Sequence, residues 1–364
     1  MTISRELAEF ATGYGAGSFA VGRNRIINGD MRIDARNAGA SITPSNGQYS
    51  LDRWLCLQDT AGKISVQQNH GSVTPPNGFT NYIGIVSLSA YTPISSDYFG
   101  VQQRIEGYNV ADFGFGAAGA KTITVSFWVR SSLTGAFGGS IFNSAQNRCY
   151  PFSYTINSAN TWEYKTATIS GDTTGTWLTN NGAGLLLNFS AGAGSSRVST
   201  ADTWTTNNTT MAPTGSVDLV ATSGATLYIT GVQLEEGTVA TPFERRQYGQ
   251  ELALCQRYFL SVGGESLYER YGIGINGSTT TGYPVIPFPV QMRAVPTLNV
   301  VNLGDTALWN GTSLIAPTGV AIDQGTTKNM SILVTVPSGL TTSAAIAWLA
   351  NGSSAPRVQF SSEL

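Results

Sequence analysis

The sequence predicts an all-β protein, organised as a jelly-roll β-sandwich followed by a short helix and a smaller C-terminal β-sandwich domain. Only 12% of the 364 residues are charged and Lys occurs four times, whereas solvated helix faces are built largely from Glu, Lys, Arg and Gln. Gly, Thr and Ser occur 42, 42 and 36 times, between short apolar runs that are typical of strands. Hydrophobic residues make up 41% of the chain, which is enough to bury a core and argues against disorder.

Residues 1–23 are expected to form an attachment segment. Ile3, Leu7 and Phe10 recur at helical intervals over about three turns, a length at which a helix is marginal in water unless it docks on a partner. A Gly-rich connector follows at residues 12–18. This pattern suits a peptide that fastens a body to a larger assembly. A terminus that packs on its own domain is the alternative.

Residues 24–244 carry the strand pattern of the jelly roll. In residues 121–130 apolar side chains alternate with side chains that point to the opposite face: Thr122, Thr124, Ser126, Trp128 and Arg130. In residues 225–234 the alternation slips beyond Gly231, which predicts a β-bulge there. Further strands are expected at residues 54–57, 64–66, 83–88, 164–169 and 185–189. Many short strands separated by long polar loops are typical of this type of sandwich.

Residues 245–259 are expected to form a linker helix, in which Leu252, Cys255 and Phe259 share one face. Residues 260–364 return to strand patterning and predict a distal β knob domain. Its strands are expected near residues 298–300, 332–336, 345–349 and 358–360. Trp348 lies within one of these runs and is expected in the core.

Charge, cysteine and histidine exclude several functions. A net charge of −2 without clusters of Lys and Arg argues against nucleic-acid binding. No apolar run approaches the roughly 18 residues that span a bilayer, so we expect no membrane insertion and synthesis in a cytoplasm. Cys56, Cys149 and Cys255 are far apart and are expected to be buried free thiols. His70 is the one histidine, which leaves a catalytic triad a single possible base. No cofactor and no metal ligand is assigned.

Three motifs stand out: residues 28–31 (Asn-Gly-Asp-Met), residues 51–54 (Leu-Asp-Arg-Trp) and the longer run 231–246. With them, the sequence resembles tailed-bacteriophage tail-fibre and receptor-binding proteins. The resemblance covers most of residues 24–364, and less of residues 1–20. It implies a central module similar to the carbohydrate-binding jelly rolls of secreted glycosidases, a place in the virion tail, and assembly as a homotrimer.

The run 231–246 is interpreted as framework. Gln233 and Glu235 alternate with apolar residues, so the last strand presents polar side chains opposite its core contacts. Gly237 and Pro242 are expected to end the sandwich and direct the chain toward the helix. A cation held by Glu235 or Glu236 is the minority interpretation.

Aromatic residues near polar or Gly-rich stretches are the candidate ligand-binding residues. Sugar binding uses aromatic faces against pyranose rings and neutral polar groups for the hydroxyls. The candidates are Trp177, Trp204, Tyr150, Trp162 and Trp309. For each of them, the alternative is a place at a sandwich edge or a subunit interface. No catalytic residue is assigned, because no spacing singles out the two carboxylic groups that glycan hydrolysis needs.

The function expected from these observations is that of a non-enzymatic virion tail fibre that adsorbs to a host-surface polysaccharide or lipopolysaccharide. Residues 1–23 would attach it to other virion tail proteins. The first alternative is a structural virion component, a decoration, collar or baseplate-linked protein that contacts only other virion proteins. The second is a capsular-polysaccharide depolymerase. A Gly, Thr and Ser surface suits both neutral sugars and sister subunits.

Overall fold

The computed structural model describes residues 22–206 and 209–364, which fall into two compact units divided between Arg246 and Gln247. The candidate attachment residues Ile3, Leu7 and Phe10 lie outside the described residues. Strands dominate both units, which confirms the predicted all-β class. In the part of the chain that the structure describes, no helix is long and apolar enough to cross a membrane.

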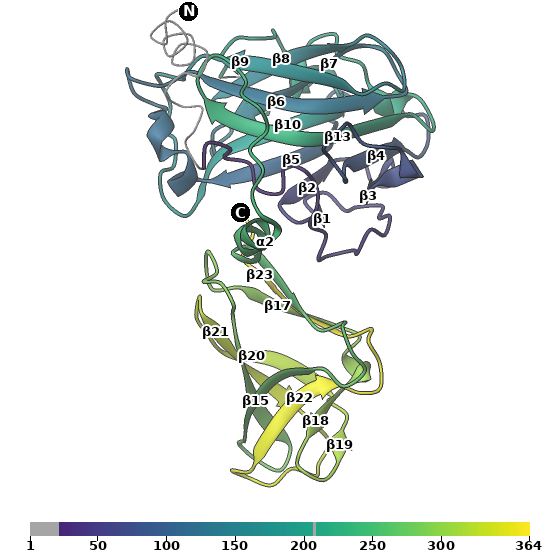
Figure 1. Cartoon of the computed structure of the whole chain (residues 1–364), viewed down its shortest axis with the longest axis vertical. Helices are drawn as coiled ribbons and strands as arrows, with labels where there is room; N and C mark the ends of the chain where they lie inside the picture. Colours follow the sequence, from purple (N-terminus) through teal and green to yellow (C-terminus); the bar gives the residue numbers. More distant parts are fainter. Residues whose placement is uncertain (1–21, 207–208) are drawn as a thin grey trace, which may run out of the picture. The chain divides into compact units, whose positions relative to one another are not determined.

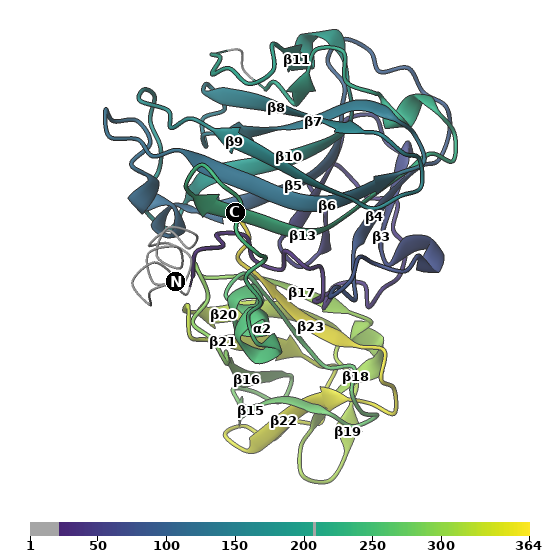
Figure 2. The same ribbon diagram turned by 45° about the horizontal axis from the view of Figure 1, so that its top comes forward.

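The first unit is a sandwich of two antiparallel sheets (Figures 1 and 2). One sheet has the order β1-β2-β5-β10-β7-β8 and the other has the order β3-β4-β13-β6-β9. Strands that neighbour each other come from distant parts of the sequence, as in a jelly roll. The strands of the six-stranded sheet are β1 (Tyr49–Leu51), β2 (Trp54–Gln58), β5 (Tyr98–Glu106), β10 (Ala183–Ala193), β7 (Gly135–Phe142) and β8 (Cys149–Ile156). Those of the five-stranded sheet are β3 (Ile64–Gln68), β4 (Ile83–Ser87), β13 (Thr226–Glu236), β6 (Ile123–Ser131) and β9 (Glu163–Ile169).

The core of the first unit lies between the two sheets. The apolar residues of β6 that alternate toward the core are fully buried: Ile123, Val125, Phe127 and Val129. The ring of Phe127 meets that of Phe189 on β10 edge to face, with centroids 4.8 Å apart. The predicted alternation in residues 121–130 is therefore confirmed. The predicted bulge is confirmed as well, because the register of β13 against β6 shifts between Thr230 and Gln233.

Strands β5, β7 and β8 are among those that the sequence pattern does not predict. Strand β7 includes Gly138 and Gly139, which break the apolar alternation. A Cβ at Gly139 would lie 2.0 Å from the carbonyl oxygen of Asn188 on the neighbouring β10. Glycine is needed there because the two backbones approach closely, which is a tertiary requirement. Strand β8 pairs with β7 and contains Tyr150. This candidate residue is therefore in a strand and not on a loop, and it is 5% exposed.

The three sequence motifs interlock in the first unit. The indole Nε1 of Trp54 donates to the carbonyl oxygen of Asn28 at 3.0 Å, and the side-chain Nδ2 of Asn28 donates to the carbonyl oxygen of Asp52 at 3.0 Å. The backbone N–H of Val232 donates to the carbonyl oxygen of Gly29 at 2.9 Å. These bonds join the start of the described chain to the last strand of the sandwich. The motifs therefore serve as framework.

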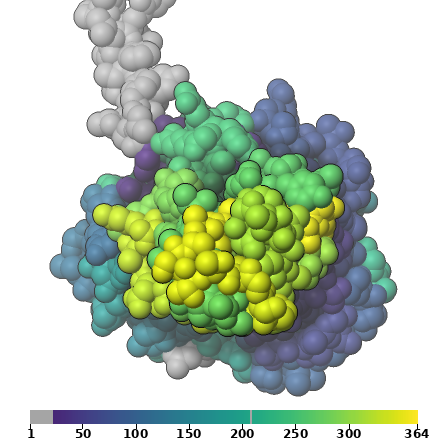
Figure 3. Space-filling view, turned by 90° about the horizontal axis from the view of Figure 1, so that it is seen from below, coloured from purple at the N-terminus to yellow at the C-terminus, as the bar shows by residue number. Residues whose placement is uncertain are grey.

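The second unit is a smaller β-sandwich, whose surface is green to yellow in Figure 3. Its sheets have the orders β14-β23-β17 and β19-β18-β22-β15-β16-β21-β20. Trp348 is fully buried in its core, as predicted. The strands of the smaller sheet are β14 (Phe259–Val262), β23 (Arg357–Ser361) and β17 (Thr297–Val301). Those of the larger sheet are β19 (Leu314–Ile315), β18 (Thr306–Trp309), β22 (Ala345–Ala350), β15 (Arg270–Asn276), β16 (Thr281–Pro287), β21 (Asn329–Thr335) and β20 (Gly319–Gly325).

The predicted helix is present but shorter than expected. Helix α2 spans Tyr248–Gln256 and buries Cys255. Its predicted extension to Phe259 is wrong, because Phe259 begins β14 and pairs with Ser361. In this pairing the backbone of Phe259 forms the hydrogen bonds of a sheet. This tertiary contact outweighs the helical spacing of Leu252, Cys255 and Phe259 in the sequence. All three cysteines are free and buried, as predicted.

Candidate functional site

A groove runs along the outer face of the five-stranded sheet of the first unit. Its floor holds Trp128 of β6 and Tyr164 of β9, which are directly opposite each other in the strand register. Their ring centroids are 5.4 Å apart and the planes are inclined by 52°. Because side chains alternate along a strand, Trp128 and Ser126 face away from the core that Phe127 enters. Two neighbouring strands thus present two aromatic rings outward.

The walls of the groove come from two segments far apart in the sequence. One is Phe79, which precedes β4, and the other is the segment 240–245 after β13. The rings of Phe79 and Phe243 meet edge to face, with centroids 5.2 Å apart. The groove has a volume of about 640 Å³. Its full lining is Phe79, Ser126, Trp128, Tyr164, Gly231, Ala240, Thr241, Pro242, Phe243 and Arg245.

The segment after β13 is held against its own strand by buried polar groups. Thr241 donates from its backbone N–H to Oε1 of Glu235 at 2.8 Å and from Oγ1 to Oε2 of the same carboxylate at 2.6 Å. The backbone N–H of Glu244 donates to Oε1 of Gln233 at 2.8 Å. The polar side chains that alternate with the core residues of β13 therefore anchor one wall of the groove.

The bulge in β13 makes room for Phe79, which forms the other wall of the groove. Gly231 has φ +61°, a left-handed conformation that favours glycine. A Cβ at this position would lie 2.6 Å from Cζ of the Phe79 ring. The bulge and the missing side chain together let Phe79 approach the sheet. The most specific part of the sequence motif thus shapes the groove, although no aromatic floor residue belongs to it.

The cation site considered for Glu235 or Glu236 is not formed. Both oxygens of Glu235 accept hydrogen bonds from Thr241, and Arg23 Nε lies 3.9 Å from Oε2. Glu236 forms an ion pair with Lys121 at 2.8 Å. Among the residues that the structure describes, no three His, Cys, Asp or Glu side chains are placed to share a metal ion.

The indole N–H of Trp128 distinguishes it from the other tryptophans of the first unit. Within the described residues it has no hydrogen-bond acceptor, although the ring is half-buried. The others all donate to protein oxygens, at 2.8–3.3 Å: Trp54 to Asn28, Trp162 to Thr74, Trp177 to Asp172 and Thr174, and Trp204 to Ser170. Because a Trp N–H usually finds a partner when its ring is buried, the unpaired donor of this half-buried ring is left to solvent or to a ligand.

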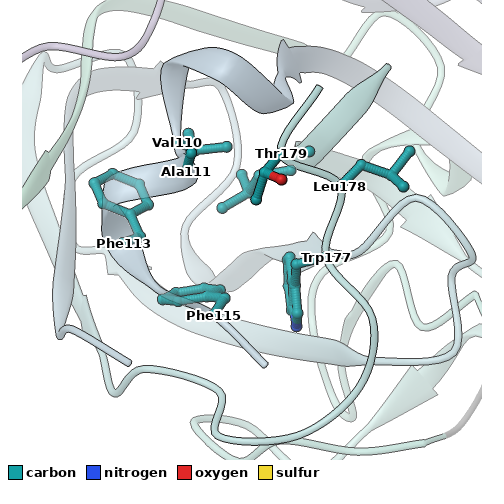
Figure 4. A pocket seen from close by; sticks show the side chains of 9 residues that line it. Val110, Ala111, Phe113, Phe115, Trp177, Leu178 and Thr179 are labelled. Atoms are coloured by element: carbon teal, nitrogen blue, oxygen red, sulfur yellow. The ribbon is translucent and has the colours of Figure 1, made fainter. Parts of the chain in front are cut away.

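Three of the sequence-predicted residues come together elsewhere, in what we call the closed cluster: Tyr150, Trp177, Trp204 and Phe115. Trp204 lies 5.2 Å from Tyr150 and 5.7 Å from Trp177 between ring centroids. Phe115 meets Trp177 edge to face at 4.8 Å. Phe115 and Trp177 line a small cavity (Figure 4). Its volume is about 10 Å³, which is room for about one water molecule.

An ion pair closes this cluster from one side. Arg148 donates from Nε and Nη2 to the two oxygens of Asp172, at 2.8 and 2.6 Å. Burial raises the pKa of Asp172, but the hydrogen bonds from Arg148 and Thr174 outweigh it and hold the pKa below the usual value. The guanidinium also lies 5.7 Å from the ring centroid of Trp204. The aromatic faces of the closed cluster are thus occupied by each other and by Arg148.

The remaining two candidates lie apart from both places. Trp162 precedes β9, with ring centroids 5.6 Å from Tyr82 and 6.4 Å from Tyr228. Trp309 ends β18 in the second unit and is half-buried before the turn that Asn310 and Ser313 close. Ligand binding by the five candidates stays a prediction.

The groove was missed because its aromatic residues are scattered along the sequence. One signal was present in the pattern itself. Trp128 alternates with core residues in residues 121–130, so it was expected on the face of the strand that carries Thr, Ser and Arg. Tyr164 alternates in the same way on its own strand, and two aromatic rings on the outer face of a sheet can pair across neighbouring strands. Nothing local to Phe79 or Phe243 indicates that they meet.

Comparisons with known proteins find distant likenesses. No family model and no curated protein sequence matches the chain. Among solved structures, the enzymatically active domain of tailspike protein 4 of bacteriophage CBA120 is 12% identical with a TM-score of 0.33, over 59% of this chain and 22% of that one. This chain therefore corresponds to about a fifth of that tailspike chain.

Carbohydrate-binding modules also appear among the similar structures. A CBM4 module is 14% identical with a TM-score of 0.30, over 58% of this chain and 98% of that one. The family 11 carbohydrate-binding module of Clostridium thermocellum, in complex with a mixed-linked tetrasaccharide, is 13% identical with a TM-score of 0.27, over 54% of this chain and 96% of that one. The strand order of the two sheets, and not these likenesses, defines the fold described above.

Proposed function

We propose that this protein is a non-enzymatic, glycan-binding component of a phage tail fibre, which adsorbs the virion to a polysaccharide or lipopolysaccharide of the host surface. The observation that carries the proposal is the groove on the five-stranded sheet. It offers two outward aromatic rings, Trp128 and Tyr164, with the free indole donor of Trp128 beside them. The place in a virion is supported by the sequence motifs and by the attachment pattern of residues 1–23.

The groove has the dimensions and chemistry of a saccharide site. Its volume of about 640 Å³ falls within the roughly 300–1,000 Å³ of small-molecule sites. The apolar face of a pyranose ring stacks on an aromatic ring, and its hydroxyls need hydrogen-bond partners. The indole N–H of Trp128 lies in the same lining as the rings, whereas the hydroxyl of Thr241 is bonded to Glu235 and Ser126 is buried. A sugar chain can therefore stack on the rings and place a hydroxyl at the Trp128 donor.

Binding without hydrolysis is supported by the composition of the lining. None of the ten lining residues is Asp or Glu. Glycoside hydrolysis needs two carboxylic groups on opposite sides of the scissile bond. The acidic residue behind the wall, Glu235, is buried and bonded to Thr241. We therefore propose adsorption, with several weak sites in a homotrimer adding up to avidity.

The test is a binding measurement on a panel of bacterial surface polysaccharides, together with adsorption of the purified protein to host cells. Trp128→Ala is expected to weaken binding at least tenfold, since a central aromatic anchor is typically worth about 2 kcal/mol or more. Tyr108→Ala is the matched control, because Tyr108 is 62% exposed and is not among the residues that line the groove. Binding lost in Trp177→Ala, while Trp128→Ala binds normally, would move the site to the closed cluster.

A depolymerase would show itself in the same experiment. Incubation of the wild-type protein with the polysaccharide that it binds is expected to leave the viscosity unchanged. A progressive fall in viscosity would overturn the non-enzymatic part of the proposal. No binding to any glycan or host cell would favour the structural virion component instead.

A further inference from the structure

One cation stands at the edge of the groove. The guanidinium carbon of Arg245 lies 4.6 Å from the ring centroid of Phe79 and 5.6 Å from that of Phe243. Within the described residues, Arg245 makes no hydrogen bond and no ion pair, and its side chain is exposed. The two rings hold its planar head in place through cation–π contacts. Its N–H donors are thus oriented and unoccupied.

The neighbouring acidic groups do not neutralise this cation by direct contact. Asp30 is bonded to Nε of Arg32 at 2.5 Å. Burial raises the pKa of Asp30, and the positive charges of Arg32 and Arg245 oppose that rise. Arg245 therefore acts on Asp30 through its charge, without forming an ion pair with it. Both oxygens of Glu244 accept backbone N–H groups, from Gly22 and Asn24, at 2.6 and 2.7 Å.

The arginines elsewhere in this unit behave differently. Arg148 is committed to Asp172 in a bidentate pair, and Arg130 donates Nε to the carbonyl oxygen of Asn160 at 2.9 Å. Arg197 donates Nε to the carbonyl oxygen of Ser96 at 2.7 Å. Arg245 is also the one charged residue in the lining of the groove. In a chain with so few charges, the groove therefore has a positive end and no negative one.

We propose that the groove binds an acidic saccharide, and that Arg245 binds a carboxylate carried by one of its sugar rings. This inference rests on the proposed glycan-binding function. A fixed guanidinium presents its N–H groups in a fork that matches the two oxygens of a carboxylate. The rings of Trp128 and Tyr164 would hold the sugar, and Arg245 would select for its charge. The alternative is that Arg245 only covers the two phenylalanine rings.

The experiment compares acidic polysaccharides with their own carboxyl-reduced forms, which keep the ring and the linkage but lose the charge. The panel is polygalacturonate, alginate, hyaluronan and acidic capsular polysaccharides of Gram-negative bacteria, each in both forms. The wild-type protein is expected to bind at least one acidic form about tenfold more tightly than the reduced form, since a hydrogen bond to a charged group is worth about 1.5–3 kcal/mol. Raising the salt concentration should weaken only the acidic form.

The variants separate charge recognition from packing. Arg245→Gln is expected to remove the preference for the acidic form, so that the acidic and the reduced form bind with the same affinity. Arg245→Lys should keep part of the preference, because it keeps the charge but not the fork. Arg270→Gln is the matched control, since Arg270 is an exposed arginine of the second unit.

Three outcomes would overturn the inference and leave the proposed function intact. The first is equal binding of the acidic and reduced forms by the wild-type protein. The second is an equal loss of both forms in Arg245→Gln, which would mean that Arg245 only supports the wall. The third is tight binding of a sulfated or phosphorylated polysaccharide and of no carboxylate, which would make the assignment of a carboxylate wrong. Binding of no polysaccharide in either form would instead sink the glycan-binding function itself.

Discussion

The groove and the closed cluster are built from similar side chains, yet only one of them is open. Each joins tryptophan to other aromatic rings on the first unit, and each has an arginine within cation–π distance of a ring. In the closed cluster the rings of Trp177 and Trp204 meet each other, and the cavity is about 10 Å³. In the groove a volume of about 640 Å³ remains above the rings. Aromatic composition therefore indicates where rings gather, and not whether a ligand can reach them.

Hydrogen bonding explains the difference. Trp177 and Trp204 donate their indole N–H groups to Asp172 and Ser170, so both rings are fixed by the protein. Trp128 donates to no protein acceptor that the structure describes. A buried donor without an acceptor lowers the stability of the fold by about 1–3 kcal/mol. The indole donors of a closed cluster therefore need acceptors from the protein, whereas a donor in an open groove can bond to solvent or to a ligand.

The largest expected effect tests the closed cluster as a structural element. Asp172→Ala would leave the guanidinium of Arg148 without its partner and would remove one of the two acceptors of the Trp177 indole, which keeps the carbonyl oxygen of Thr174. We expect the free energy of unfolding of the first unit to fall by about 3 kcal/mol, which is typical of breaking a buried ion pair. Chemical denaturation followed by tryptophan fluorescence measures it. Asp202→Asn, at an exposed position whose φ of 58° asparagine also tolerates, is expected to change stability by less than about 0.5 kcal/mol.

A loss from Asp172→Ala no greater than that from the control would contradict a structural role for the closed cluster. The two regions would then differ in shape alone.

A smaller effect tests the wall of the groove. Thr241→Val removes the 2.6 Å hydrogen bond to the buried Glu235 carboxylate. We expect a loss of about 1.5 kcal/mol in stability, because hydrogen bonds to charged groups are worth about 1.5–3 kcal/mol. Glycan binding should weaken as the wall loosens. Thr238→Val, an exposed threonine of the same segment, is the control and should leave both measurements unchanged. Normal binding by the less stable Thr241→Val protein would mean that the wall does not shape the site.

The smallest expected effect comes from the same substitution, Trp to Phe, made once in each of the two regions. Phenylalanine keeps an aromatic face and removes the indole N–H. Trp177→Phe is expected to cost about 1 kcal/mol of stability through the lost bond to Asp172, and to leave glycan binding unchanged. Trp128→Phe is expected to leave stability unchanged and to weaken binding several-fold. Denaturation and titration of both variants check the pair of outcomes, and the reverse pattern would exchange the roles of the two regions.

Much of the first unit could be predicted because one face of each strand is buried. The alternation of Ile123 to Val129 and its slip beyond Gly231 follow directly from burial, which imposes a period of two on an amphipathic strand. The missed strand β7 shows the limit of this reasoning. Gly139 is required by the approach of Asn188, which lies 49 residues away in sequence, so no local pattern signals it.

The candidate site was harder to predict for a related reason. Tyr150, Trp177 and Trp204 were expected to bind sugar because of the polar and Gly-rich residues around them. The structure shows those residues folding the rings together, as when Ser170 accepts the indole N–H of Trp204. Trp128 could have been singled out by its place on the outer face of its strand. Phe79 and Phe243 could not, because their contact depends on the bulge and on the return of the chain after β13.

The sequence by itself determined the all-β class, the framework motifs, the buried cysteines and the scarcity of charge. These properties follow from composition and short-range periodicity, which depend only on residue types and on residues close together in the sequence. Only the tertiary structure decided which aromatic rings are covered, which indole donor is free and where the one cation of the groove stands. Such properties depend on strand register and on contacts between distant segments. If β6 paired with its neighbours one residue out of register, the side chain of Trp128 would point into the core.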